Sequence, residues 1–569
     1  MTTKHLFGYR VFLFLLLGTF LNTPSFLYAQ VVPADVDTSR LRPTPLPLPS
    51  VPTFDLRIET PERSAVSKAV DELSFDIGDI VVEGAQQYPK SEADRFFKPL
   101  IGTRATLSDI REAADKLENR YRQDGFFLVR VFIPPQQVKD GVFKIQVIEG
   151  YIEGISAEGG SEAARDLIEN MLAHLVKKRP IDLPSLERAL LIMNDMPGIR
   201  GSGVLRQGGQ LGASELVVSI ADTPVPSLVV GFNNTASKIM GEFATLANLT
   251  ITNPFEFQPG QLSLGVNASA DFQRLRALNA RYATAVGLDG LVFSIGGLVA
   301  NARPGGSLKA LDIESNSSAI SSRLRYALSR GRMTSSYLEA GLSLNHSRTT
   351  LLGSELTLDR STVFDTALSI VDNRWEGSTE ASVGIARGLG LFGANDNDAA
   401  RPSVQGFTPG FTKLRVNLAR NQTLPHHLSL QFQSQGQWTA DKLLAGEQIA
   451  FGGVGLGRAY DTGAVIGDRG AGLLLELRRD ILPEHWHVLR GGRLQLYVFS
   501  DYAYASLLAN SATGSAATSS WLQSVGAGMR YRNDSGLNID FLVADARRAI
   551  QSTDPKRDPR VVVMLTKAF

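Results

Sequence analysis

The chain has 569 residues, a formal net charge of +1 and 43% apolar residues. A charge balance this close to neutral gives no indication of a nucleic-acid partner or of binding to an anionic surface. The sequence contains no cysteine, which excludes thiolate metal sites, cysteine nucleophiles and disulfides.

The N-terminus predicts export from the cytoplasm. Lys4 and Arg10 precede the apolar run 11–21, and small and polar residues lead to Ala29. This order is typical of a signal peptide over residues 1–29, and the alternative of a membrane anchor needs a span of about 20 apolar residues. Because no later segment has such a run, we expect any membrane insertion to use a β-barrel.

Residues 30–72 form a proline-rich segment. Seven prolines lie in it, at positions 33, 43, 45, 47, 49, 52 and 61. Proline removes backbone donors and favours extended polyproline conformations. We therefore expect a linker or an extended arm and not a packed core.

Two small α+β modules are predicted next, over residues 73–150 and 151–222. In the first, residues 75–82 read as a strand, and apolar residues from Leu107 to Tyr121 recur at the helical spacing of three and four. The second repeats the order β-α-α-β-β, with a helix that starts after Asp182 and ends before Gly198.

From residue 223 to 569 the pattern predicts a membrane β-barrel. The segment from Leu428 to Trp438 alternates apolar residues with glutamines, as expected of a strand between lipid and a watery lumen. At roughly 20 residues per strand and loop, this region gives about 16 antiparallel strands. A soluble propeller or sandwich is the alternative. The chain ends on Phe569 after an alternating strand in which Lys567 shares the apolar face.

The stretch from Leu443 to Gly470 contains eight glycines. Such density is unfavourable in helices and strands and suits a long loop that folds back in tight space. Within it lie Arg458 and Tyr460, and it ends in Gly467, Asp468, Arg469 and Gly470.

The whole mature chain resembles the transporter subunit of two-partner secretion, the haemolysin secretion/activation (TpsB, ShlB/FhaC/HecB-type) family. Residues 186–198 resemble the signature helix of its second POTRA module, and residues 447–453 the strand end before its sixth surface loop. Gly457-Arg458-Ala459-Tyr460 and residues 467–470 resemble the motifs of that loop. Residues 499–503 resemble the wall motif Phe-x-Asp-x-Gly.

The resemblance implies that the loop of residues 451–470 folds into the lumen and that Arg458 pairs with Asp501 as a latch. Strand parity agrees, because Asp501 shares one face with Arg493 and Gln495. The alternative is that both are ordinary lumen charges. Ala459 and Ala503 replace two glycines of the family pattern, which puts the local backbone in doubt.

The family further implies the function: an outer-membrane pore whose periplasmic POTRA modules recognise a large partner exoprotein by its N-terminal secretion domain and export it to the cell surface. Its other expected partners are outer-membrane lipid, the barrel-assembly machinery that would read Phe569, and periplasmic chaperones. A barrel-insertion factor is the alternative function, and an outer-membrane hydrolase is a distant one.

Catalysis and cofactors are not expected. The seven histidines are scattered and form no H-E-x-x-H, and no G-x-S-x-G elbow or P-loop is present. In the family a helix from the N-terminal arm can plug the pore. The prolines at 43–52 leave room for such a helix only in residues 34–42, so a plug is not predicted.

Overall fold

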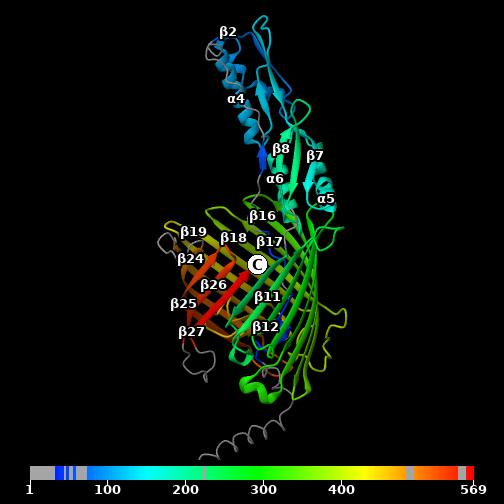
Figure 1. The fold of residues 1–569 in the computed structure, drawn as a ribbon, viewed down its shortest axis with the longest axis vertical. Helices are drawn as coiled ribbons and strands as arrows, with labels where there is room; N and C mark the ends of the chain where they lie inside the picture. The colour runs from blue at the N-terminus through cyan, green and yellow to red at the C-terminus, as the bar shows by residue number, and fades with distance from the viewer. Residues whose placement is uncertain are drawn as a thin grey trace, which may run out of the picture.

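The computed structural model describes residues 33–43, 46–49, 56–58, 73–221, 226–481, 492–548 and 559–569. The expected signal peptide and much of the proline-rich segment lie outside these ranges. Two small modules stand end to end at one end of the molecule, and a large barrel forms the other (Figure 1). Within the described residues, no helix is long and apolar enough to cross a bilayer.

The first module follows the predicted order β-α-α-β-β, except that the strand predicted at residues 75–82 is divided into β2 and β3 and that a further short strand, β4, precedes the second helix. Strands β3, β6 and β5 form one sheet, in which β3 and β6 are parallel, and β2 pairs with β4. Buried residues of the helices and of this sheet form one core. The elements are β2 (Ser74–Asp76), β3 (Asp79–Glu83), α3 (Lys90–Asp94), η3 (Lys98–Leu100), β4 (Arg104–Thr106), α4 (Leu107–Gln123), β5 (Arg130–Phe132) and β6 (Val142–Ile148).

Helix α4 starts at a capping box formed by Thr106 and Asp109. The hydroxyl of Thr106 accepts a hydrogen bond from the Asp109 N–H, and the Asp109 carboxylate accepts one from the Thr106 N–H. These reciprocal bonds satisfy two N–H groups that the first turn leaves without helical partners. The hydrogen bonds from Thr106 also lower the pKa of the Asp109 carboxyl.

The second module contains a strand from the proline-rich segment. Strand β1 (Leu56–Ile58) pairs in parallel with β8, so the sheet order is β1-β8-β9-β7. The sequence had placed these residues in a linker or an extended arm. The other elements are β7 (Tyr151–Gly159), α5 (Glu162–Leu172), η4 (Ala173–Lys177), α6 (Leu183–Asp195), β8 (Gly201–Gln207) and β9 (Ala213–Ile220).

The C-terminal region is a closed barrel of 16 antiparallel strands, as predicted, and β10 pairs with β27 to complete the ring. The strands are β10 (Ser227–Asn233), β11 (Ala244–Thr252), β12 (Gly260–Ser269), β13 (Leu275–Val286), β14 (Leu291–Ala302), β15 (Glu314–Arg330), β16 (Thr334–Leu351), β17 (Ser354–Asp372), β18 (Gly377–Leu389), β19 (Thr412–Leu424), β20 (Leu428–Thr439), β23 (Arg469–Ile481), β24 (Gly492–Leu507), β25 (Thr518–Asn533), β26 (Leu537–Ala546) and β27 (Arg560–Ala568).

Side chains alternate between the lumen and the outer wall along each strand. On β24, Tyr497 and Asp501 are buried inside the barrel, while Leu496 and Val498 are exposed on the outer wall. On β20, Gln437 is buried in the lumen and Trp438 is exposed outside. This is the polar-in, apolar-out arrangement of a barrel in lipid.

The second module is docked on the barrel through helix α6. The Asp195 carboxylate accepts two hydrogen bonds from the Arg330 guanidinium, at 2.6 and 2.8 Å, and one from the Tyr337 hydroxyl at 3.4 Å. Tyr337 also joins the core of the module, and Asn253 of a barrel turn donates to the Gly198 carbonyl at 2.9 Å. The signature segment of residues 186–198 is thus the joint between module and barrel.

We predict that Asp195→Ala loosens this joint. Arg330, whose side chain is 4% exposed, would lose its carboxylate, and breaking such a buried pair costs about 3–5 kcal/mol. The sequence contains no cysteine, so spin labels at Asn170→Cys and Asp534→Cys report the distance between module and barrel. The variant should broaden a distance distribution that is narrow in the wild type.

The control is Glu112→Ala, which removes an exposed ion pair with Lys116 in the first module. Exposed pairs contribute about 0–1 kcal/mol, so the control should keep the narrow distribution. An equally narrow distribution for Asp195→Ala would contradict the role of the pair in docking.

Candidate functional site

The loop between β20 and β23 returns on itself as a two-stranded ribbon inside the barrel. Strand β21 (Ile449–Phe451) pairs with β22 (Val465–Gly467), and Phe451, Leu456 and Tyr460 pack with inward residues of β23 to β26. Gly457 has φ +97°, and an added Cβ would lie 3.0 Å from the Leu522 side chain. Glycine is therefore required where the loop meets the wall.

Arg458 forms an ion pair with Glu476, not with Asp501 as the sequence predicted. Its Nη1 donates to Glu476 Oε2 at 2.6 Å, and both side chains are buried, with exposed fractions of 8% and 0%. The guanidinium lies over the ring of Phe499, 4.5 Å from its centre, which adds a cation–π contact. The Arg458 Nε has no hydrogen-bond partner in the described structure.

Asp501 holds the backbone of the loop. Its carboxylate accepts the N–H of Gly457 at 3.0 Å and the N–H of Arg458 at 3.3 Å. The predicted partner is therefore in contact with the loop, but through main-chain atoms. The Asp501 carboxylate is satisfied at the loop tip, so the long Arg458 side chain extends past Phe499, which faces Glu476 in the ladder.

Glu476 is the centre of a larger charge network that the sequence analysis missed. It also accepts hydrogen bonds from Arg530 at 2.6 Å and from Arg478 at 2.7 Å. Arg530 in turn donates to Asp540 at 2.7 Å. One sequence signal was available: Glu476 is the inward residue between the outward Leu475 and Leu477 of an alternating strand.

Tyr460 and Ala459 connect the loop tip to the strands near the barrel seam. The Tyr460 hydroxyl donates to backbone carbonyls of Gln523 and Arg548, at 3.1 and 2.7 Å. The Ala459 N–H donates to the Ser524 hydroxyl at 3.2 Å. Arg560 of β27 donates to the Tyr460 carbonyl.

The two alanines that depart from the family pattern are accommodated. Ala459 is 5% exposed and Ala503 is fully buried, and both belong to the apolar cluster around the loop. Ala503 faces Gly472 in the ladder of β23 and β24. An added Cβ at Gly472 would lie 3.2 Å from the Ala503 Cβ, so the missing side chain of Gly472 makes room for the methyl of Ala503.

The Gly467–Gly470 motif fixes the base of the loop. Asp468 is fully buried and accepts hydrogen bonds from the Leu443 N–H, the Leu508 N–H and the Gln448 side chain, at 2.9–3.2 Å. Gly467 passes so close to β24 that an added Cβ would lie 2.6 Å from a backbone nitrogen. Arg469 lies over the Trp438 ring at 5.4 Å, and Gly470 begins the pairing with β20.

The proline-rich arm lies in the lumen beside this base. Its outer end packs through Val36 against residues of the surface loops, and Leu48 packs against the core of the second module. Between them, Thr38 contacts Ser315 at 3.0 Å and Arg325 donates to the Pro47 carbonyl at 2.7 Å. The described residues of the arm lie in the lumen as extended chain with two short turns, one at residues 34–36 and the other η2 (Thr38–Arg40).

Glu447 joins the arm to the loop. It accepts a hydrogen bond from Arg42 of the arm at 3.0 Å and one from Lys413 of β19 at 2.9 Å, and Glu447 is 6% exposed. Gln437 donates to the Glu447 carbonyl at 3.1 Å. The sequence had singled out residues 447–453 as a family motif without finding either cationic partner, because both lie far away along the chain.

Phe569 lies at the seam of the barrel. Its N–H donates to the Leu228 carbonyl at 2.8 Å, and its side chain is 71% exposed. Lys567 lies 5.5 Å from the centre of the Phe569 ring and donates to Ser535 at the adjacent turn. In the described parts of the chain, no group of three or more His, Asp or Glu side chains is placed to hold a metal ion.

We predict that Arg458 and Glu476 are energetically coupled and that Arg458 and Asp501 are not. Arg458→Ala and Glu476→Gln each remove half of one buried pair, so the double variant should be little worse than the more damaging single variant. Asp501→Asn weakens the acceptor for the backbone N–H groups of residues 457 and 458. Arg458→Ala keeps both N–H groups, so the stability losses of Asp501→Asn and Arg458→Ala should add. Thermal unfolding and the rate of protease cleavage within residues 452–464 measure the effect of each single and double variant.

A coupling energy between Arg458 and Asp501 as large as that between Arg458 and Glu476 would overturn this assignment. Coupling in contacting pairs is about 0.5–3 kcal/mol, which such double-mutant cycles resolve. Heat-modifiable migration on gels confirms that each barrel is folded before comparison.

We also predict that Arg42→Ala raises ion conductance through the barrel. The change removes the contact of the arm with Glu447 and with the Gly446 carbonyl, so the arm should leave the lumen more often. Planar-bilayer recordings should show openings several-fold more frequent, and deletion of residues 33–49 should leave the pore open for longer still.

Arg303→Ala, which removes an exposed pair with Glu314, is the control. Unchanged conductance after deletion would show that the arm does not obstruct the pore.

Comparison with known proteins shows the same architecture. A family model described as "Haemolysin secretion/activation protein ShlB/FhaC/HecB" matches residues 212–531, more than half of the chain, and one for the ShlB-type POTRA domain matches residues 75–150. The chain is 23% identical over 487 residues to the Heme/hemopexin transporter protein HuxB of Haemophilus influenzae, which covers 83% of this chain and 84% of HuxB.

Solved structures of two relatives share the fold. CdiB from Escherichia coli superposes with a TM-score of 0.69 at 19% identity, covering 90% of this chain and 93% of that one. CdiB from Acinetobacter baumannii superposes with a TM-score of 0.58 at 14% identity, covering 100% of both chains.

Proposed function

Because this chain belongs to the haemolysin secretion/activation protein ShlB/FhaC/HecB family, we propose that it captures one large partner exoprotein through its POTRA modules and exports it through the barrel. The chain is an outer-membrane transporter. Its barrel lies in the outer membrane and its modules in the periplasm, where the turns between strands are short and the loops on the opposite side are long.

The observation that carries the capture step is the pairing of β1 with β8. A short extended segment of the arm occupies one edge of the second module's sheet in parallel register, from Leu56 opposite Gly203 to Ile58 opposite Leu205. This edge therefore accepts an extended strand by β-augmentation. An unfolded partner presents such strands, and it binds there once β1 leaves.

The path from this edge to the lumen supports the threading step. The same arm that supplies β1 lies in the lumen and contacts the loop through the hydrogen bond from Arg42 to Glu447. Displacement of the arm therefore vacates the edge and the pore together. Since the periplasm supplies no ATP, folding of the partner outside the cell biases the direction of transport.

The barrel-assembly machinery and periplasmic chaperones are further proposed partners, which act while the barrel forms. Phe569 ends the last strand with an exposed aromatic ring at the seam, in reach of insertion machinery before the barrel closes. Periplasmic chaperones would keep the strands apart until then, because unpaired strand edges aggregate.

We predict that the secretion domain of the partner contacts β8 directly. A photo-crosslinking residue at Arg206, exposed on β8, should capture the secretion domain of an exoprotein encoded beside the transporter gene, whereas the same residue at Asn170 on α5 should not. Deletion of residues 56–58 removes the strand that competes for β8 and should raise the affinity of the module for the secretion domain about fivefold. This factor corresponds to roughly 1 kcal/mol for the short competing pairing.

Two measurements distinguish export from the alternative of barrel insertion. Loss of the transporter should abolish surface exposure of the exoprotein and leave the levels of other outer-membrane barrels unchanged. A general fall in barrel levels would favour the insertion factor. Equal crosslinking at Arg206 and Asn170 would overturn the assignment of the edge while leaving export itself intact.

A further inference from the structure

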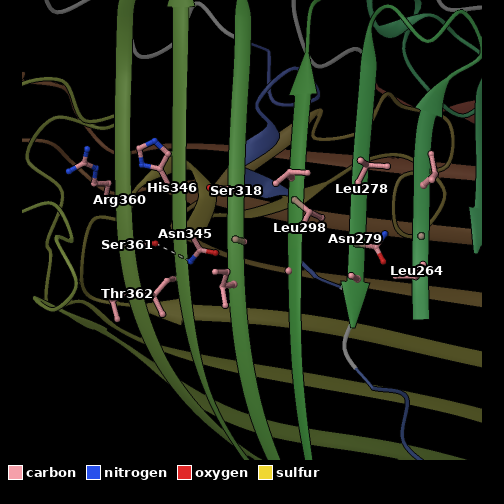
Figure 2. A pocket seen from close by; sticks show the side chains of 18 of the residues that line it. Leu264, Leu278, Asn279, Leu298, Ser318, Asn345, His346, Arg360, Ser361 and Thr362 are labelled. Atoms are coloured by element: carbon pink, nitrogen blue, oxygen red, sulfur yellow. Dashed lines mark hydrogen bonds between the residues drawn. The ribbon is translucent and has the colours of Figure 1, made fainter. Parts of the chain in front are cut away.

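The outer wall of the barrel carries a groove that secretion through the lumen does not use. It has a volume of about 920 Å³, and most of its lining residues come from strands β10 to β17; Figure 2 shows part of this lining. The ladder register aligns its outward side chains in two neighbouring rows, one through Ala280, Gly297 and Ile320 and the next through Ser318, His346 and Arg360. The groove thus runs across the strands.

The floor of the groove is apolar and hollowed by small side chains. Ala280 and Gly297 lie side by side in one row, between the larger Leu264 and Ile320. An added Cβ at Gly297 would meet only the Ala319 carbonyl oxygen, at 3.7 Å, so open space lies above it. A chain of methylene groups fits such a floor, and each buried methylene contributes about 0.8 kcal/mol.

The groove ends at a polar rim. Along the outer face of β16, Leu342 and Leu344 are followed by His346 and Arg348, and Arg360 faces His346 from β17. An apolar band in such barrels is about 25 Å tall, and the rim lies 12 residues along β16 from its periplasmic start at Thr334. The rim therefore lies at the head groups of the outer leaflet.

A surface loop forms one side of the groove. The Thr362 hydroxyl donates to the Leu391 carbonyl at 2.9 Å, and the Asn395 N–H donates to the Arg360 carbonyl at 2.9 Å. These bonds hold Phe392, which lines the groove and is 71% exposed, against the outer wall. The groove is thereby bounded where an ordinary barrel wall would be open.

The rim carries a positive charge without an acidic partner. In the described structure no ion pair involves Arg360, whereas the neighbouring Arg348 pairs with Glu355 at 2.9 Å. His346 adds an imidazole beside Arg360 (Figure 2). A guanidinium is well suited to bind phosphate, because its planar fork of donors matches the phosphate oxygens.

We infer that this groove binds the phosphate and an acyl chain of a phosphorylated lipid of the outer leaflet. An acyl chain lies over Ala280 and Gly297, and the lipid phosphate lies on Arg360 and His346. The apolar floor and the cationic rim are adjacent, as the acyl chain and phosphate of one lipid are. This site lies outside the lumen and is separate from the loop and the arm.

The test uses the full chain reconstituted in phosphatidylethanolamine nanodiscs. Diphosphorylated lipid A, dephosphorylated lipid A and phosphatidylglycerol are added separately, and native mass spectrometry counts the lipids retained. We expect diphosphorylated lipid A to be retained at least tenfold better than the dephosphorylated form. Gly297→Leu, which fills the floor, and Arg360→Gln, which removes the rim charge, should each lower retention at least fivefold.

Two matched controls separate this site from the ordinary lipid shell. Ala527→Leu enlarges an exposed outward residue on β25, and Arg387→Gln removes an exposed outward arginine on β18 that does not line the groove. Both should retain lipid as the wild type does, and heat-modifiable migration confirms folding of all four variants. Equal retention by all variants would overturn the site, and so would displacement of the lipid by inorganic phosphate alone.

Discussion

The closed ladder of the barrel is the constraint on which the rest of the structure depends. In lipid every backbone N–H and C=O needs a partner within the protein, so 16 strands close on themselves through β10 and β27. Side chains alternate between the two faces of each strand, so half of them point into the lumen and must be compatible with water. The lumen is therefore lined by charged groups such as Glu476 and Arg530, which can hold a loop and an arm.

Two carboxylates, those of Asp501 and Glu476, bind different parts of the loop. Asp501 fixes the position of the main chain at Gly457 and Arg458, and Glu476 fixes the direction of the Arg458 side chain. The first contact depends on loop geometry, and the second on charge. Because Glu476 also binds Arg530 and Arg478, removal of Arg458 leaves it neutralised. The ion pairs of Glu476 with Arg530 and Arg478 therefore do not involve the loop.

The two occupants of the lumen form one polar assembly that reaches the periplasm. Glu447 at the loop base binds Arg42 of the arm, and the arm continues through Leu48 to the second module. Helix α6 of that module is clamped to the barrel by Asp195 and Arg330. The described residues of one chain segment therefore contact both the surface loop, through Arg42, and the sheet of the second module, through β1.

The sequence by itself determined the elements whose causes are local. Alternation in residues 428–438 fixed the lumen face of a strand, the Thr106–Asp109 box fixed the start of α4, and strand parity pointed Asp501 inward. Only the tertiary structure decided which charges meet. Glu476, Lys413 and Arg42 lie on different segments, and the register between β23 and β24 sets which acid the Arg458 guanidinium reaches. The alternating pattern determines only which face of its strand each side chain occupies, because the partner of a side chain depends on strand pairing and on the packing of the loop against the wall.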